Sequence, residues 1–369
     1  MKREKKLRLG FIGGGINSIA GYPHFIAAQM DQKFEVVGGI FSSDMENNNK
    51  ASEKYNVPAF SNIEEMFDNI DLDAVSVLTP TNIHYENIIA LSEKNCNVIC
   101  EKPIVSSYDD AKKIAMIQNK PLITTTYNYT GYPMIRELRA LLLGGTLGKI
   151  LKINLEMPQE SFLRPPKSHL YPQKWRLNDD FIPSINLDLG VHLHNLAYFL
   201  TDDMPRNIFA NMANFSKYKV IDDTNIFMKH DSEVLTHLWI SKIALGNRNG
   251  LKVNIYGSEG SAQWIQENPE NLQICLTNGE KINIDRGSNC LVANEKRYNR
   301  MTPGHPGGYL EAFANVYFDI ASHLMDKKSS QESNNYVDNL DYSIESIKAL
   351  HCASLSNEHK RWVSIDEID

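Results

Sequence analysis

Cysteine is scarce in this chain, with five residues among 369. Their number is odd, and their positions lack the spacing that is typical of metal ligands. Neither a disulfide framework nor a metal site is therefore expected, and reduced thiols in the cytoplasm fit best. The five are Cys96, Cys100, Cys275, Cys290 and Cys352.

Long hydrophobic runs and an excess of basic charge are also missing. No apolar stretch has the length needed to cross a bilayer, so we expect no membrane partner. The net charge of −7 argues against nucleic acid as the main partner, because phosphate binding needs a basic face. The remaining composition is that of an ordinary globular protein, and 369 residues exceed the usual size of one hydrophobic core. We therefore expect two domains, or one domain with a large insertion.

Short apolar runs alternate with helical patterns through the first third of the chain. Runs of this kind, bounded by turn residues, are typical of buried parallel strands. A capping box at Ser61 and Glu64 opens one of the intervening helices, and Ser107 caps another. The pattern predicts an α/β domain with a doubly wound parallel sheet over residues 1–127. The expected strands are 7–12, 34–41, 74–78, 98–103 and 121–126.

A glycine-rich turn, Gly13-Gly14-Gly15, directly follows the first expected strand. Free backbone N–H groups at a helix start bind pyrophosphate oxygens, and glycines let the phosphate approach closely. Helical spacing resumes at Ile19, and Ser18 stands where the third glycine of such a fingerprint usually falls. The position of the turn between a strand and a helix predicts a dinucleotide site.

The second strand ends in Ser42-Ser43-Asp44 rather than in an acid at its tip. An acid there would accept the ribose hydroxyls of NAD and repel the additional phosphate of NADP. Serines donate to a phosphate without excluding a ribose, whereas Asp44 is near enough to favour NAD. The expected cofactor is NAD or NADP, with NAD slightly favoured.

The run of residues 98–103 ends in Glu101-Lys102-Pro103. In an open parallel sheet the ligand lies beyond the carboxyl ends of the strands, so we expect the Lys102 side chain to face it. Pro103 biases Lys102 toward an extended or turn conformation. A desolvated lysine suits proton transfer, and the alternative is a solvated loop residue. His84, in the first turn of the helix after the third strand, either contacts the cofactor or is structural.

From about residue 128 onward, the apolar runs have the length and pattern of strands, and turn residues typical of β-hairpins separate them. Successive strands without intervening helices indicate a mostly antiparallel sheet, which we expect to form a separate domain over residues 128–369. Helices are expected at 134–143, 308–325 and 342–355. The expected strands are 150–157, 225–229, 234–240, 251–256, 262–265 and 272–276.

Asp188 and His192 stand four residues apart where a helical rhythm begins, so on a helix they share one face. A carboxylate beside an imidazole raises its proton affinity and orients the ring, which suits a general acid or base. The same spacing equally fits a structural role for both residues, in which Asp188 caps the helix and His192 lies in the core. His194 points elsewhere on the same helix and is not expected to act.

Trp175, Arg176 and His305 lie in turn-rich segments, where binding residues concentrate. An indole face and a forked donor suit a sugar-like ligand. An exposed tryptophan more often lies at a subunit contact or covers the core.

Four motifs, taken in chain order, resemble those of the family that includes glucose-fructose oxidoreductase, inositol dehydrogenase and rhizopine catabolism proteins. They are the glycine turn, Thr79-Pro80 with His84, Glu101-Lys102-Pro103, and Asp188 with His192. The resemblance covers nearly the whole chain, and Glu101-Lys102-Pro103 is its most specific motif. It implies a Rossmann domain followed by an α+β domain whose large open-faced sheet binds substrate and mediates dimers or tetramers.

The resemblance also implies hydride transfer between a nicotinamide and a carbon that bears a sugar or cyclitol hydroxyl. By that resemblance His192 takes the hydroxyl proton, while Asp188 and Lys102 position the substrate and share the path of the proton, so that all three residues are catalytic. Ser42 and Asn195 depart from the family, since many members carry an acid at these positions. The implied cofactor contacts are Gly13, Gly15, Ile16, Asn17, Ser42, Ser43, Thr79, Pro80, Asn82, His84, Glu101 and Lys102. The implied substrate contacts are Lys102, Asn128, Trp175, Arg176, Asp188, His192 and His305.

The sequence thus predicts a cytoplasmic NAD(P)-dependent dehydrogenase or ketoreductase of a sugar, sugar derivative or cyclitol, assembled as a homodimer or homotetramer. Two alternatives stay open. One is a nicotinamide-binding regulator without turnover, against which the combined presence of Lys102, Asp188 and His192 argues. The other is a lyase or hydrolase that holds its nicotinamide permanently.

Overall fold

A computed structural model describes residues 6–118, 121–164, 172–325 and 336–368. The chain divides into two compact units. The first unit comprises Met1–Gly131 and Tyr309–Ile344, and the second comprises Tyr132–Gly308 and Glu345–Asp369. The sequence predicts a single cut between residues 127 and 128, whereas each compact unit is built from two separate segments.

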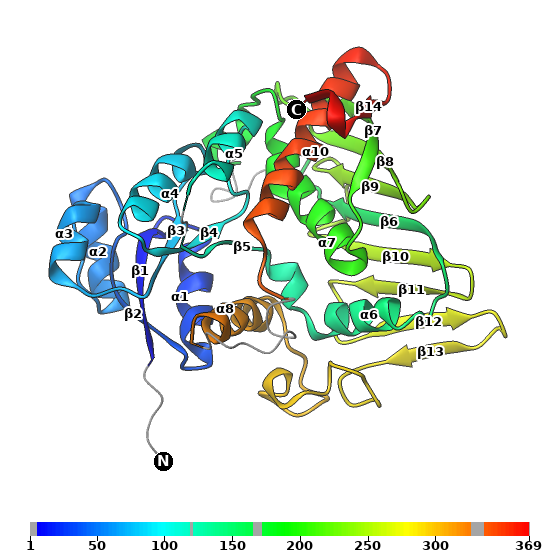
Figure 1. Ribbon diagram of the computed structural model, residues 1–369, viewed down its shortest axis with the longest axis horizontal. Coiled ribbons are helices and arrows are strands. Elements are labelled where there is room, and N and C mark those ends of the chain that lie inside the picture. The colour runs from blue at the N-terminus through cyan, green and yellow to red at the C-terminus, as the bar shows by residue number, and fades with distance from the viewer. Residues whose placement is uncertain (1–5, 119–120, 165–171, 326–335, 369) are drawn as a thin grey trace. The chain divides into compact units, whose positions relative to one another are not determined.

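The first unit contains a five-stranded parallel sheet with the strand order β2-β1-β3-β4-β5 (Figure 1). This arrangement confirms the predicted doubly wound sheet. Its strands are β1 (Leu7–Gly13), β2 (Phe34–Ile40), β3 (Ala74–Leu78), β4 (Asn97–Glu101) and β5 (Ile123–Thr126). Its helices are α1 (Gly21–Met30), α2 (Met45–Tyr55), α3 (Ile63–Asn69), α4 (His84–Glu93), α5 (Tyr108–Ala115) and α8 (Tyr309–Met325).

Buried apolar side chains of the central strands explain why these segments form the middle of the sheet. Leu9 and Phe11 of β1 and Ile99 of β4 are fully buried. The same core contains Phe313 and Tyr317 from α8, a helix that follows most of the second unit in the sequence. The later segment of the chain is therefore part of the first hydrophobic core.

The capping box that opens α3 lies one residue later than the sequence predicts. The side chain of Asn62 accepts a hydrogen bond from the Glu65 N–H at 2.8 Å, and the Glu65 carboxylate accepts from the Ser61 N–H at 2.7 Å. Asn62 still has extended backbone angles, so it is the cap and the helix begins at Ile63. The cap of α5 at Ser107 is confirmed.

The second unit contains a nine-stranded sheet with the order β13-β12-β11-β10-β6-β9-β8-β7-β14. β6 and β9 are parallel neighbours and the other pairs are antiparallel, which confirms the predicted sheet type. The predicted strands appear as β6 (Ile150–Pro158), β8 (Asp223–His230), β9 (Leu235–Ser241), β10 (Lys252–Gly257), β11 (Gly260–Ile265) and β12 (Leu272–Leu276). The unpredicted strands are β7 (Pro205–Ala213), β13 (Lys281–Ile284) and β14 (Val363–Ser364).

Alternate side chains of this sheet face opposite sides. On β8, Ile226 and Met228 are buried, whereas Asn225 and Phe227 are half-buried. Helices α6 (Pro133–Leu143) and α7 (Val191–Thr201) pack against the sheet (Figure 1), and α10 (Leu340–His359) lies along β7, where the Ser356 hydroxyl accepts from the Ala210 N–H at 2.9 Å. The face with the half-buried side chains carries none of these described helices.

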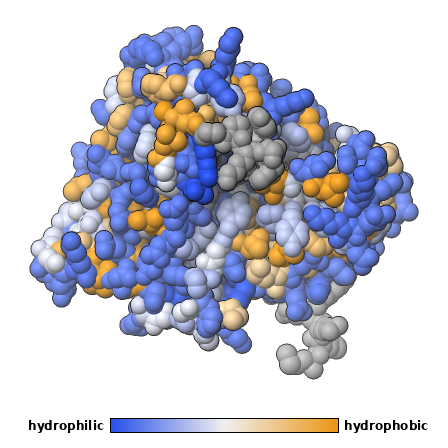
Figure 2. All heavy atoms as spheres, turned by 180° about the vertical axis from the view of Figure 1, so that it is seen from behind, coloured by the Kyte–Doolittle hydropathy of each residue, from blue (hydrophilic) through white to orange (hydrophobic). Residues whose placement is uncertain are grey.

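Hydrophilic residues predominate on the face of the protein that is drawn in Figure 2. On the face drawn in Figure 2, hydrophobic residues form small separated patches. Strongly exposed apolar side chains such as Ile19 and Met116 are scattered along the chain. None of the described helices combines the length and the apolar character needed to span a membrane.

Two buried histidines predict that stability depends on pH. His24, in the first unit, is fully buried with Nδ1 at 2.8 Å from the Tyr317 hydroxyl, and His194, in the second unit, is 2% exposed. Burial lowers the pKa of each from 6.5 to about 3. Because the unfolded chain binds these protons more tightly, stability that is present above pH 6.5 is lost as the pH falls toward 3. Each histidine lowers the free energy of unfolding by up to about 1.4 kcal/mol per pH unit in this window.

Urea denaturation at about pH 7, 6 and 5 measures this loss. We expect the free energy of unfolding to fall at each step. The variant His24→Gln keeps a polar side chain that does not titrate, so its stability should depend less steeply on pH. An unfolding free energy that stays constant between these pH values would contradict the prediction.

Candidate active site

The glycine turn after β1 needs glycine at two positions for steric reasons. Gly13 has φ = 84°, and a Cβ on it would lie 2.6 Å from the backbone carbonyl carbon of Leu78. A Cβ on Gly15 would lie 2.6 Å from the carbonyl oxygen of Phe41. The turn therefore presents bare backbone next to the ends of β2 and β3, which is the surface that a pyrophosphate requires.

Helix α1 begins at Gly21, later than the sequence predicts. The small residue that was expected at Ser18, in the place of a third glycine, is Gly21 in the structure, because a Cβ on Gly21 would overlap the carbonyl oxygen of Gly14. Ser18 stays in the turn, where its N–H donates to the Gly15 carbonyl oxygen at 2.9 Å and its hydroxyl accepts from the Gly21 N–H at 3.1 Å. The turn also leaves Ile16 half-buried and Asn17 exposed, two of the predicted cofactor contacts.

Ser42 and Ser43 follow β2, and Asp44 comes next. The Asp44 carboxylate accepts from the Asn47 N–H at 2.8 Å and thereby caps α2. Buried Asn48 fixes the end of the strand, since its side-chain oxygen accepts from the Phe41 N–H at 2.8 Å. The end of β2 thus carries two hydroxyls and one exposed carboxylate.

His84 is the first residue of α4 and is 1% exposed. Its Nδ1 lies 2.9 Å from the Pro103 carbonyl oxygen, and its Nε2 lies 2.9 Å from the Thr79 carbonyl oxygen. Burial is the main cause of its lowered pKa. The ring thus joins the segment after β3 to the segment after β4, and Pro80 and Asn82 remain exposed beside it.

Lys102 directly follows β4 at the carboxyl edge of the parallel sheet and is half-buried. The Glu101 carboxylate accepts from the Lys102 N–H at 2.6 Å and from the Thr126 hydroxyl of β5 at 2.9 Å. The peptide bond between Lys102 and Pro103 is cis. Glu101 therefore fixes the backbone that carries the Lys102 side chain.

Asn128 begins a short 3₁₀ turn (Asn128–Gly131) after β5 and is 1% exposed. Its side-chain nitrogen makes no hydrogen bond to any residue that the structure describes. The far end of the turn is held by Asn315 of α8, which donates to the Gly131 carbonyl oxygen at 2.8 Å. The Asn128 side chain therefore offers an amide donor to a ligand, from a turn that is held in place beside the edge of the sheet.

Asp188 lies in a π-helical turn (Asn186–Gly190) that leads into α7. Its carboxylate accepts two hydrogen bonds from Arg176, at 2.7 and 3.0 Å, and one from Lys242 at 2.8 Å. The Arg176 guanidinium also lies over the Trp175 ring, 4.2 Å from its centroid. The second unit thus brings together three predicted site residues, Trp175, Arg176 and Asp188, and adds Lys242.

His192 is the second residue of α7 and is 6% exposed. A π-helical turn between Asp188 and His192 replaces the plain α-helix from which a shared face was inferred. Such turns occur frequently at functional sites. His194 and Asn195, which follow on the same helix, are both almost completely buried.

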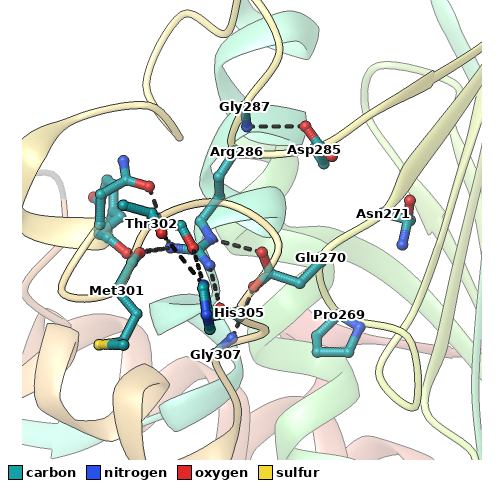
Figure 3. Close-up of polar contacts among 12 residues, drawn as sticks. Pro269, Glu270, Asn271, Asp285, Arg286, Gly287, Met301, Thr302, His305 and Gly307 are labelled. Atoms are coloured by element: carbon teal, nitrogen blue, oxygen red, sulfur yellow. Dashed lines mark hydrogen bonds and ion pairs between the residues drawn. The ribbon is translucent and has the colours of Figure 1, made fainter.

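His305 lies in a loop that is organised by Arg286 (Figure 3). Arg286 is 4% exposed and pairs with Glu270 at 2.7 Å, and Glu270 also accepts from the Gly307 N–H at 3.1 Å. Arg286 further donates to the carbonyl oxygens of Tyr298 (2.7 Å), Met301 (3.3 Å) and His305 (2.9 Å). The exposed His305 ring therefore belongs to a cluster other than that of Asp188.

Lys242 and Arg286 are the site residues that sequence reasoning missed. Lys242 directly follows β9 and Arg286 comes just after β13. A basic residue immediately after a buried apolar strand is the signal that singled out Lys102, and it applies equally to Lys242. No spacing in the sequence relates Arg286 to Glu270.

A pocket of about 380 Å³ lies at the start of β7 in the second unit. Arg206, on its wall, pairs with Asp231 at 2.8 Å and with Asp366 at 3.2 Å. None of the predicted site residues that the structure describes lines this pocket. Because Arg206 is already paired with two carboxylates, we assign this pocket no role in binding the cofactor or the substrate.

Two family models match successive parts of the chain. Residues 7–128 match an oxidoreductase family with an NAD-binding Rossmann fold. Residues 135–263 match the GFO/IDH/MocA C-terminal domain. Together these matches cover more than half of the chain, and the second begins near Tyr132, the first residue of the second compact unit.

Similar proteins span the length of the chain. An uncharacterized oxidoreductase of Bacillus subtilis, YfiI, is 27% identical over 98% of this chain and 97% of its own length. Glucose-6-phosphate 3-dehydrogenase of the same organism is 23% identical over 71% of this chain and 75% of its own. The structure of an inositol dehydrogenase homolog from Azotobacter vinelandii, complexed with NADH and myo-inositol, superposes with a TM-score of 0.88 at 23% identity and covers 98% of both chains.

Proposed function

Because the chain belongs to the oxidoreductase family in which an NAD-binding Rossmann domain precedes a GFO/IDH/MocA C-terminal domain, we propose that it is a dehydrogenase of a sugar, sugar derivative or cyclitol. It transfers a hydride between NAD(H) and a hydroxyl-bearing carbon. The observation that carries the proposal is the bare Gly13–Gly15 turn and Lys102 at the same carboxyl edge of one sheet. The names of the relatives that act on glucose 6-phosphate or bind myo-inositol support this substrate class.

The residues of the first unit fit a nicotinamide dinucleotide. The backbone at Gly13, Gly15, Ile16 and Asn17 would hold the pyrophosphate, since the turn can lie this close to the ends of β2 and β3 only without a Cβ on either glycine. Ser42 and Ser43 would meet the adenosine ribose, and the nearby Asp44 carboxylate favours NAD over the more negative NADP. Contacts from Thr79, Pro80, Asn82 and Glu101 would follow along the sheet edge, and the buried His84 ring would hold the Thr79 backbone in place for them.

When bound, NAD(H) supplies the hydride acceptor or donor. A hydride leaves a carbinol carbon only if its hydroxyl proton is removed, so the substrate oxygen needs a base. We assign this role to His192 and assign substrate positioning to Lys102, Asp188 and Asn128. The position of Asp188 is set by three hydrogen bonds from two cations, and Asn128 offers an amide donor that no described residue accepts.

Reduction of NAD⁺ by the purified protein with glucose, xylose, myo-inositol and glucose 6-phosphate tests this function. We expect reduction with at least one member of the panel. Lys102→Ala should lower the turnover of that substrate, whereas Lys94→Ala, which removes an exposed lysine of the same unit, should not. Tight NADH binding without reduction across the panel would favour a regulator or a permanently held nicotinamide instead.

We also propose that the protein is a homodimer or homotetramer joined through the outer face of the nine-stranded sheet. Phe209, Phe227 and His237 stand opposite one another on β7, β8 and β9 and form a half-buried aromatic row on that face. The Phe227 and His237 rings are stacked, with centroids 4.5 Å apart. Light scattering should give a dimer or tetramer mass, and Phe227→Glu should dissociate it. A monomer mass for the unmodified protein would contradict this assembly.

A cytoplasmic location is proposed from the cysteines. No disulfide joins the five among the residues that the structure describes, and four of them are buried. Free buried thiols are typical of proteins in reducing compartments.

A further inference from the structure

We propose that the substrate carries an anionic oxygen group, a carboxylate or a phosphate, and that the cluster of Arg176, Asp188 and Lys242 selects it. The inference rests on the proposed function and narrows it from sugars and cyclitols in general to acidic ones. Three properties of this cluster carry it: its charge, its hydrogen-bonding capacity and its exposure.

The cluster has more positive than negative charge. One carboxylate, Asp188, is paired with two cations, so one positive charge is in excess within the three groups. The Asp188 and Lys242 side chains are 6% and 3% exposed, and solvent therefore screens this charge poorly. Asp179 lies on the same segment as Arg176, but its carboxylate accepts hydrogen bonds from the N–H groups of Ser184 and Ile221 and so is not counted in the charge of the cluster.

The acceptor capacity of the cluster is largely used. A carboxylate has about four lone-pair positions, and those of Asp188 receive three hydrogen bonds from the two cations. A neutral polyol needs acceptors as well as donors, because each hydroxyl donates one hydrogen bond. Asp188 therefore has little capacity left for sugar hydroxyls.

Donor capacity remains on Arg176. Of its five N–H groups, two are directed to Asp188 and one to Gln173, and the other two meet no acceptor among the described residues. The Arg176 side chain is 25% exposed, and the Trp175 ring covers one face of its guanidinium. A ligand thus approaches the edge of the guanidinium, where charge-assisted hydrogen bonds to a carboxylate or phosphate form.

Matched probes test this selection by calorimetry on the NADH-bound protein. The probes are glucose, glucuronate and glucose 6-phosphate, which share one ring and differ in charge and in the kind of anionic group. We expect the preferred anion to bind about 10- to 100-fold more tightly than glucose, and the difference to shrink as salt is added. Comparison of the two anions identifies carboxylate or phosphate as the selected group.

Variants locate the preference. Arg176→Gln should abolish it without changing NADH binding, whereas Arg176→Lys should retain part of it. Lys242→Met offers a second removal of charge should Arg176→Gln fold poorly. Arg248→Gln, which removes a 71% exposed arginine paired with Glu160, should keep the full preference.

Different results would contradict the anion preference and the dehydrogenase function. Glucose binding as tightly as both anions, or an anion preference that survives both Arg176→Gln and Lys242→Met, would overturn the inference and leave the dehydrogenase proposal standing. Selective anion binding without NAD⁺ reduction would overturn the proposed function and retain a site for an anionic ligand.

Discussion

Replacing His192 by glutamine is expected to lower kcat for oxidation of the substrate by about 10²- to 10⁴-fold and to leave NADH binding unchanged. Glutamine is polar and of similar length, but it does not accept a proton at neutral pH. His192 follows the π-helical turn that holds Asp188 and is 6% exposed, so the helix presents it from a fixed position. Steady-state rates and a nicotinamide fluorescence titration separate the two effects.

His194→Gln is the matched control for this variant. His194 lies two residues later on the same helix and is 2% exposed. Any loss of activity in this control should match its loss of folded protein, which thermal denaturation measures. The kcat per folded molecule should stay unchanged. A His192→Gln enzyme that retains the full kcat would remove His192 from the proton transfer.

Gly13→Ala is expected to weaken NADH binding on the order of 100-fold, because small displacements of a positioning backbone have large effects. The new Cβ would lie 2.6 Å from the Leu78 backbone, at a φ of 84° that disfavours alanine. The turn must then move away from the end of β3. Fluorescence titration with NADH measures the loss directly.

Gly145→Ala separates the steric effect from backbone strain. Gly145 has a φ of 76°, similar to that of Gly13, but a Cβ on it would meet nothing within 4 Å. We expect this control to be slightly less stable and to bind NADH normally. Equal NADH affinity in Gly13→Ala and the unmodified protein would show that the turn does not hold the dinucleotide.

The regular elements were largely predictable from the sequence, and the exceptions have local physical causes. β7 begins with Pro205 and carries Asn207 and Asn211 on its exposed side, so no continuous apolar run marks it. β13 lies at the sheet edge and is mostly exposed, and β14 has two residues. The start of α1 was misplaced because Ser18 and Gly21 both satisfy the requirement for a small residue, and the contact of Gly21 with Gly14 is a property of the folded turn.

Part of the candidate site could be predicted from the residues at which strands end. Lys102 was found because the order of strands in a parallel sheet places it at the ligand edge. The pairing of Asp188 with Lys242 could not be predicted, since Lys242 lies 54 residues downstream and the packing of the π-helical turn against β9 brings the two together. Long-range charge pairing of this kind leaves no periodic signal in a sequence.

The most direct test of the account is a titration of the purified protein with NADH and NADPH, followed by nicotinamide fluorescence. The bare glycine turn and the acid near the end of β2 predict saturable binding of both or of NADH alone, with NADH binding at the lower concentration. Binding of neither nucleotide would contradict the assignment of Gly13 to Asn17, and with it the proposed hydride transfer.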